Sequence, residues 1–173
     1  MFKKQEINDH IFPRLKKESY LHRRKLRDYV LRFSEDVLPG KTVLDFGCGN
    51  KPYLRFFSTK NYFGIDGSLK SKADIIGLDD LPIKDNSMDY VMSYQVLEHV
   101  KYPMSFMALL TDRLRSGGIL HLELPNHQSL TAKMRKISPF ISKDYGFIQP
   151  PMHLRAYQRK TLQYLVNQLN MET

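Results

Sequence analysis

The chain has one cysteine, no tryptophan and no long apolar run among its 173 residues. A single cysteine excludes an internal disulfide and fits a reducing compartment. No apolar run approaches the roughly 18 residues that a membrane-spanning helix requires. The first residues, Met1 to Glu6, lack the apolar core of a signal peptide. We therefore expect one globular domain without a membrane span, located in the cytoplasm.

Acidic residues are fewer than basic ones, and the formal net charge is +9. Residues 1–32 carry +6 and residues 126–173 carry +5, whereas residues 33–125 carry −2. Basic flanks suit an anionic substrate, a membrane surface or a nucleic acid, and they are equally consistent with solvated helix faces. Because no regular aromatic interleaving accompanies these charges, nucleic acid is a possible partner that the sequence does not favour.

A single domain, residues 1–173, is expected in three parts. Residues 1–40 form a basic helical segment, residues 41–125 alternate strands and helices, and residues 126–173 form a lid-like loop and a final helix. Strands are predicted at 41–46, 61–66, 73–77, 89–94 and 119–124, and helices at 14–37, 103–115 and 158–169, with Gly117-Gly118 closing the second helix. This alternation predicts a mostly parallel sheet whose ligands bind at the carboxyl ends of its strands.

The most informative motif is the turn Gly47-Cys48-Gly49, which follows a buried strand ending in Asp45 and Phe46. Two glycines let the backbone approach a ligand closely. The competing interpretation is a dinucleotide site, but Pro52 stands where that motif has a third glycine. An acid at position 45 would also repel a pyrophosphate. The pattern suits a ligand with a cationic or hydroxylated edge better than a bare phosphate, and the stretch resembles the first motif of the class I S-adenosylmethionine-dependent methyltransferases.

Carboxylates after successive strands suit the other parts of S-adenosylmethionine. Asp66, before Gly67, is predicted to accept both ribose hydroxyls, or else to be a turn residue. Asp45 orients the glycine turn or meets the ammonium through water. The acidic turn after the third strand offers a carboxylate and Leu81 to adenine, unless it is merely solvated, and Gln95 lies beneath the methionine or starts a helix. The predicted cofactor-binding residues are Asp45, Gly47, Cys48, Gly49, Asp66, Gly67, Asp79, Asp80, Leu81 and Gln95.

Residues 41–126 resemble the small-molecule class I S-adenosylmethionine-dependent methyltransferases, including the group that methylates quinone precursors. The matching segments are VLDFGCGNKPYL, YFGIDGS, LPIKDNSMDYVMSYQVLEHV and LRSGGILHLELPN. The resemblance implies a Rossmann-like doubly wound sheet, S-adenosylmethionine as methyl donor and Asp66 as the ribose acid. Family members usually add a sixth and seventh strand that this sequence is expected to lack. The fifth strand then becomes an exposed edge: either another chain covers it, as when copies of the chain pair there, or the sequence is a shortened form.

The resemblance implies methyl transfer, which needs in-line placement of a nucleophile and, for an oxygen or nitrogen acceptor, a base. His99, His127 and His153 are the candidates, although packing is the commoner role for such residues, and no residue is assigned to a metal. The preferred function is methyl transfer to a small-molecule or lipid-linked acceptor. The alternatives are modification of RNA or protein docked on the basic flanks, and a shortened non-catalytic form that binds cofactor or a partner.

Overall fold

The computed structural model describes residues 11–12, 20–77, 81–129, 133 and 153–172. The chain divides into two compact units, each of which is described by itself. The first unit comprises Met1–Ser93 and Arg113–His121, and it holds most of the sheet. The second comprises Tyr94–Asp112 and Leu122–Thr173. No helix within the described ranges combines the length and hydropathy needed to cross a membrane.

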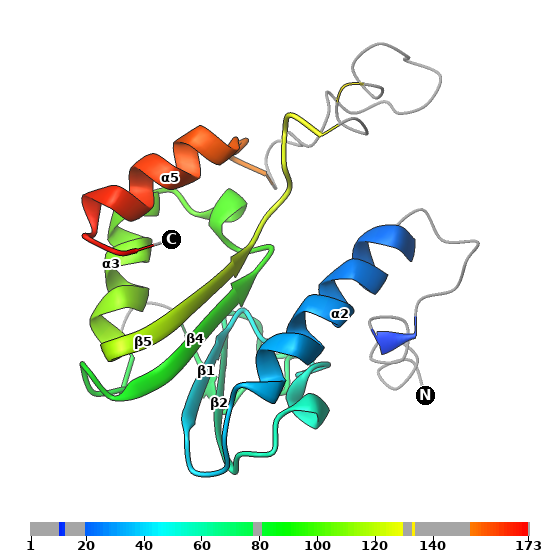
Figure 1. Ribbon diagram of the computed structural model, residues 1–173, viewed down its shortest axis with the longest axis vertical. Coiled ribbons are helices and arrows are strands. Elements are labelled where there is room, and N and C mark those ends of the chain that lie inside the picture. Colours follow the sequence, from blue (N-terminus) through cyan, green and yellow to red (C-terminus); the bar gives the residue numbers. More distant parts are fainter. Residues whose placement is uncertain (1–10, 13–19, 78–80, 130–132, 134–152, 173) are drawn as a thin grey trace. The chain divides into compact units, whose positions relative to one another are not determined.

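The sheet has five strands within the described residues, in the order β3-β2-β1-β4-β5 (Figure 1). Their bounds are β1 Thr42–Phe46, β2 Asn61–Asp66, β3 Ile75–Ile76, β4 Met88–Tyr94 and β5 Leu114–Glu123. β1 pairs in parallel with β2 and β4, and β2 pairs in parallel with β3. β1 and β4 are buried along nearly their whole length, as strands covered on both faces must be. The predicted Rossmann-like class is confirmed, and β1 lies at the switch in strand order, where ligands bind.

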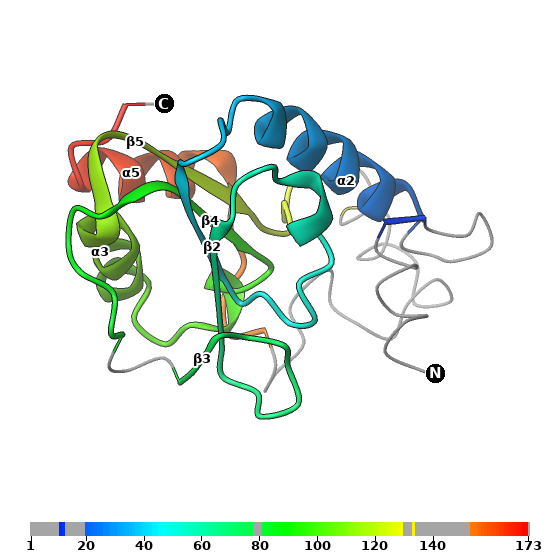
Figure 2. The same cartoon turned by 90° about the horizontal axis from the view of Figure 1, so that it is seen from below.

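The helical elements are α2 Tyr20–Glu35, η1 Leu54–Phe56, η2 Leu97–His99, α3 Pro103–Arg113 and α5 Arg159–Gln168. In the first unit, α2 lies along the sheet (Figure 2). Its Phe33 ring is 5.3 Å from the Tyr90 ring of β4 and 4.8 Å from the His121 ring of β5. Leu26 and Val30 on α2 are buried. The start of the predicted helix, residues 14–19, lies outside the described residues.

β5 differs from the sequence prediction, because the strand begins at Leu114 and not at Ile119. Gly117 and Gly118 therefore lie inside the strand and do not close α3. Gly117 has a left-handed φ of 72°. A Cβ on Gly118 would lie 3.1 Å from the carbonyl oxygen of Asp89. Glycines in a strand interior mark such bends and close backbone approaches. The sequence analysis interpreted the pair as a helix stop, which was wrong.

β5 lies at one edge of the sheet, as expected, and Ile119 on it is 46% exposed. No sixth or seventh strand occurs in the part of the chain that the structure describes. Pairing of two copies through this edge stays a prediction. The proposed lid, within residues 126–156, lies mostly outside the described residues, and the three-part division of the domain also remains a prediction.

The amino ends of the strands are fastened by Asp89 of β4. Its Oδ2 accepts hydrogen bonds from the backbone N–H of Thr42 at 2.8 Å and from the Thr42 hydroxyl at 2.9 Å. Its Oδ1 lies 3.1 Å from Lys41 Nζ and 3.2 Å from an Arg115 nitrogen. Burial opposes ionisation of Asp89, but the bonds from Thr42 and Lys41, together with Arg115, outweigh it and lower the pKa of Asp89. This end of the sheet is thus held by a charged network.

Candidate cofactor site

The glycine turn follows β1 directly and is bound to the end of β2. The backbone N–H groups of Gly47 and Cys48 both donate to the carbonyl oxygen of Ile65, at 2.8 and 3.0 Å. Gly47 and Gly49 have φ values of 82° and 51°, in the left-handed region that glycine adopts without strain. A Cβ on Gly49 would meet no atom of the described residues within 4 Å. The backbone at Gly49 is therefore open to close approach by a ligand.

Asp66, the last residue of β2, turns its carboxylate toward this turn. Its Oδ2 accepts the backbone N–H of Gly49 at 2.8 Å, and its Oδ1 accepts the backbone N–H of Ser68 at 2.8 Å. The residue is only half-buried. Each carboxylate oxygen accepts two hydrogen bonds, so both oxygens retain capacity for hydroxyl donors of a ligand. Gly67, which follows, is exposed.

Asp45 lies beneath the turn, where only 3% of its surface is exposed. The Tyr62 hydroxyl of β2 donates to its Oδ2 at 2.5 Å. Burial raises the pKa of Asp45 to about 7, although the bond from Tyr62 and the charge of Lys51 act in the opposite direction. A carboxyl group held this way inside the protein favours the role of orienting the turn over direct contact with a ligand.

Cys48 fills a packing position between β1 and β2. Its side chain is buried, and a Cβ on Gly64 would come within 2.7 Å of its Sγ. Burial is the main cause that raises the pKa of the Cys48 thiol to about 12, and the charges of Asp45 and Asp66 add to it. Because the thiolate is the reactive form of cysteine, its burial and raised pKa favour a packing role for Cys48 over a nucleophilic one.

Lys51 reinforces the turn from its far side. Its φ is 50°, in the left-handed region. Lys51 Nζ lies 2.5 Å from Asp74 Oδ2, and the same oxygen accepts the backbone N–H of Gly64 at 2.7 Å. The backbone N–H of Lys72 donates to the carbonyl oxygen of Gly49 at 2.8 Å. Sequence reasoning missed Asp74, because nothing in the pattern links it to Lys51 across 23 residues.

The remaining predicted cofactor residues are placed as follows. Leu81 is buried, whereas Asp79 and Asp80 lie outside the described residues. Gln95 belongs to the second unit and has a left-handed φ of 57°. Its backbone N–H donates to the Glu123 carbonyl oxygen at 2.8 Å, and its Nε2 donates to Glu123 Oε2 at 2.6 Å. Glu123 was not singled out from the sequence.

The second unit brings two of the candidate histidines together. The rings of His99 and His153 lie 4.8 Å apart at an interplanar angle of 68°. Glu98, beside them, is 1% exposed. Burial is the chief cause that raises the pKa of Glu98, while its own backbone N–H and the two histidines lower it. The third candidate, His127, donates its backbone N–H to the Tyr157 carbonyl oxygen at 3.0 Å.

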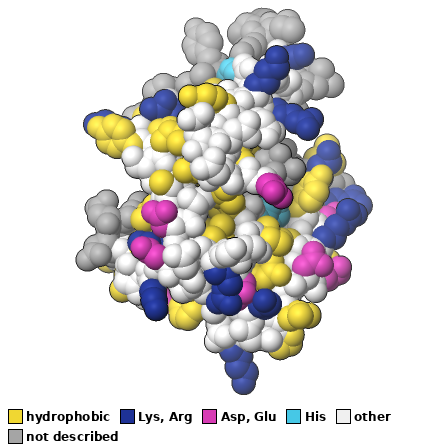
Figure 3. All heavy atoms as spheres, turned by 60° about the vertical axis from the view of Figure 1, so that its left-hand side comes forward, with side chains coloured by type: hydrophobic (Ala, Val, Ile, Leu, Met, Phe, Trp, Pro, Cys, Tyr) yellow, Lys and Arg dark blue, Asp and Glu magenta, His cyan; other side chains and the backbone are white. Residues whose placement is uncertain are grey.

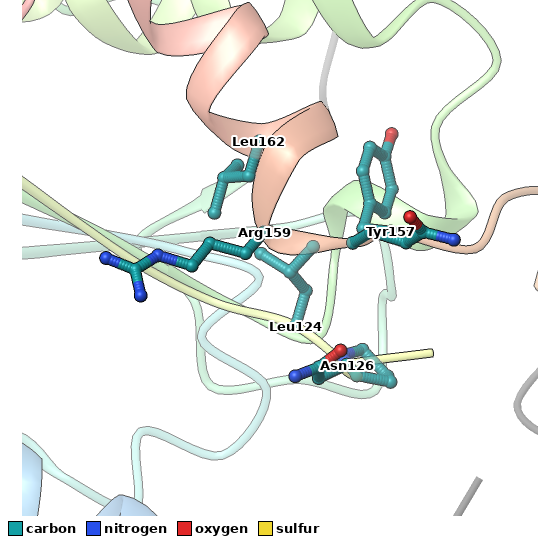
Figure 4. Close-up of a pocket in the computed structure, with 7 residues that line it drawn as sticks. Leu124, Asn126, Tyr157, Arg159 and Leu162 are labelled. Carbon is teal, nitrogen blue, oxygen red and sulfur yellow. The ribbon is translucent and has the colours of Figure 1, made fainter. Parts of the chain in front are cut away.

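A pocket of about 270 Å³ lies in the second unit, between the end of β5 and the start of α5 (Figure 4). Apolar side chains form much of its wall, together with two amides, a phenol and a guanidinium. The lining residues are Leu124, Pro125, Asn126, Tyr157, Gln158, Arg159 and Leu162. Its size suits a substituted ring or a short chain and lies just below the usual range for small-molecule sites.

The fold and the glycine turn define a class of protein, and a family model described as a methyltransferase domain matches residues 18–173. This match covers most of the chain, which therefore belongs to the class I S-adenosylmethionine-dependent methyltransferases. S-adenosylmethionine is the cofactor of this class. The family predicted from the sequence is confirmed.

Curated relatives match only part of the chain. A tRNA U34 carboxymethyltransferase of Methylococcus capsulatus is 31% identical over 105 residues, covering 50% of this chain and 32% of the relative. One from Pseudomonas paraeruginosa is 34% identical over 105 residues, covering 50% and 33%. The chain thus spans about a third of the length of these relatives.

Solved structures support the fold over nearly the whole chain. A methyltransferase of Archaeoglobus fulgidus that depends on S-adenosylmethionine superposes with a TM-score of 0.64 at 18% identity, covering 96% of this chain and 73% of the other. One from Aquifex aeolicus gives a TM-score of 0.56 at 16% identity, covering 95% and 86%. At these identities the likeness concerns the fold alone.

Proposed function

We propose that this chain binds S-adenosylmethionine at the turn Gly47-Cys48-Gly49 and transfers its methyl group to an acceptor. The observation that carries the proposal is the hydrogen bond from the Gly49 backbone to Asp66 Oδ2. It holds a half-exposed carboxylate against a turn whose backbone is open to a ligand. This arrangement suits a ribose diol beside an amino acid group.

The residues in and around the turn have separate roles in this proposal. Asp66 accepts the ribose hydroxyls, and Gly49 lets the backbone come close to the amino acid part. Asp45 and Tyr62 hold the turn from below through their 2.5 Å hydrogen bond. The bound cofactor supplies a methyl group on an already activated sulfonium, so the protein's task is to position the acceptor.

A small-molecule or lipid-linked acceptor is the preferred substrate class. The pocket lined by Leu124, Leu162 and Arg159 supports it, because an apolar wall with one cation suits an amphipathic molecule that carries an acidic or polar group. We assign this pocket to the acceptor.

RNA is the second candidate, because the curated relatives are named as tRNA-modifying enzymes. The match to them covers 50% of this chain, and two thirds of each relative lies outside it. On the face shown in Figure 3, the Lys and Arg side chains of the described residues are interspersed with acidic and apolar ones. Proteins usually bind a phosphate backbone through a clustered basic surface. RNA therefore ranks second among the candidate acceptors.

The test has two stages. Calorimetry first measures the binding of S-adenosylmethionine and S-adenosylhomocysteine to the full chain; absence of binding overturns the proposal. Labelled donor is then incubated with separated lipid, small-molecule, RNA and protein fractions, and labelled products are identified by mass. Label in the lipid or small-molecule fraction supports the preferred acceptor, label in RNA or protein replaces it, and binding without transfer to any fraction identifies a non-catalytic form.

A further inference from the structure

We propose that Glu98, His99 and His153 form a binding site for a divalent transition-metal ion. Each of the three offers one ligand atom, and these atoms all lie within 4.8 Å of one another. All three residues belong to the second unit. The inference does not rest on the proposed function, since it concerns metal binding and has readouts that do not involve methyl transfer.

The buried carboxylate of Glu98 is the strongest observation. Its side chain is 2% exposed. Neither of its oxygens accepts a hydrogen bond from another of the described residues. The Nε2 atom of His99 lies 4.0 Å from Glu98 Oε1, beyond hydrogen-bond distance. A buried carboxylate without such bonds is costly unless a cation is near, and a metal ion held between these groups supplies one.

Hydrogen bonds hold the two contributing segments together without any metal. The Glu98 carbonyl oxygen accepts the backbone N–H groups of Leu154 and Arg155, at 2.9 and 3.2 Å. The Arg155 guanidinium donates to the carbonyl oxygen of Lys101 at 2.9 Å. These bonds bring His153 beside η2, 54 residues further along the chain than His99. The three donors are thus preorganised, which lowers the entropic cost of binding an ion.

The donor set indicates which ions fit. Two imidazole nitrogens and one carboxylate oxygen suit zinc, iron, manganese or cobalt better than calcium or magnesium, which prefer oxygen ligands. Three protein ligands leave at least one coordination position for water or a ligand oxygen. His99 is 41% exposed at its side chain, so the ion would be accessible from solvent.

The test uses the full chain after treatment with a chelator and dialysis. Titration with ZnCl2 and with MnCl2, followed by metal analysis of the dialysed protein, is expected to give about one ion per chain for at least one metal. We expect His153→Ala, which removes one of three ligands, and Glu98→Gln, which replaces the anionic ligand with a neutral amide, each to weaken binding by about 100-fold. His22→Ala, at an exposed position on α2 in the first unit, is the matched control and should bind as the unaltered chain does.

A second measurement on the unaltered chain avoids dependence on variant folding. Bound metal should protect His99 and His153 from modification by diethyl pyrocarbonate, whereas His22 should react equally with and without metal. Substoichiometric binding of both metals, unchanged affinity in folded His153→Ala protein, or equal modification of all three histidines with metal present would each overturn the site.

Discussion

The backbone N–H of Gly49 donates a 2.8 Å hydrogen bond to Oδ2 of Asp66. This bond joins the turn after β1 to the last residue of β2, so the acid and the glycine backbone form one structural unit. Ser68 donates to the other oxygen of Asp66 at the same distance. The carboxylate is therefore oriented before any ligand arrives.

Replacing Asp66 should remove cofactor binding. We expect Asp66→Ala to weaken S-adenosylhomocysteine binding at least about 100-fold, because a bidentate, charge-assisted contact to the ribose diol is worth roughly 3 kcal/mol or more. Isothermal titration calorimetry measures the effect.

Asp89 provides the matched control, because it also accepts a backbone N–H at 2.8 Å but lies at the opposite end of the strands. Asp89→Ala should lower the free energy of unfolding by about 1–3 kcal/mol and leave the affinity of the remaining folded protein unchanged. If Asp66→Ala binds as tightly as Asp89→Ala, the assignment of the ribose acid is wrong.

Gly64 should not tolerate a methyl group. A Cβ there would overlap Lys51 Cε and lie 2.7 Å from Cys48 Sγ. We expect Gly64→Ala to lower the free energy of unfolding by about 1–3 kcal/mol, measured by urea denaturation.

A double-mutant cycle separates this contact from other causes. In a Cys48→Ala background the sulfur is absent, so Gly64→Ala should cost distinctly less than in the unaltered chain. Equal costs in the two backgrounds would show that the sulfur contact does not limit the site.

Asp45 should make stability depend on pH. The pKa of its carboxyl is about 7 in the folded chain, against an ordinary value of 3.8. The folded state therefore holds the proton more tightly, so the contribution of Asp45 is complete below about pH 4 and is lost as the pH rises toward 7. The loss amounts to roughly 4 kcal/mol for a shift of this size.

The variant Asp45→Asn should remove this slope, since an amide does not ionise and still accepts the Tyr62 hydroxyl. Urea denaturation between pH 4 and pH 8 compares the two proteins. Asp112→Asn, at an exposed acid on α3, should behave as the unaltered chain. Parallel curves for Asp45→Asn and the unaltered chain would mean that Asp45 is ionised throughout.

The sequence predicted the strands and the glycine turn, because the signal for each lies in neighbouring residues. Val43 and Leu44 belong to an apolar run next to glycines, and the run is a buried strand. Asp66 ends a second such run, so parallel pairing brings it to the turn after the first. The same logic failed at Gly117, because a glycine in a bent strand and a glycine after a helix look alike in sequence.

Contacts between residues that are far apart in the sequence could not be predicted from it. His99 and His153 were considered separately, since no periodicity spans the residues between them and only the bonds to the Glu98 carbonyl oxygen bring them together. The burial of Glu98 depends on tertiary packing, which no local pattern reports. The assignment of individual residues to the cofactor stays a prediction.

The packing of Cys48 under Gly64 has a practical consequence. As the chain's lone thiol, buried in the first unit, it is a built-in probe of local opening. Its rate of labelling by a maleimide should report how often the segment around it opens locally. A tightly bound nucleoside should slow that rate, so no labelling site needs to be engineered into the protein.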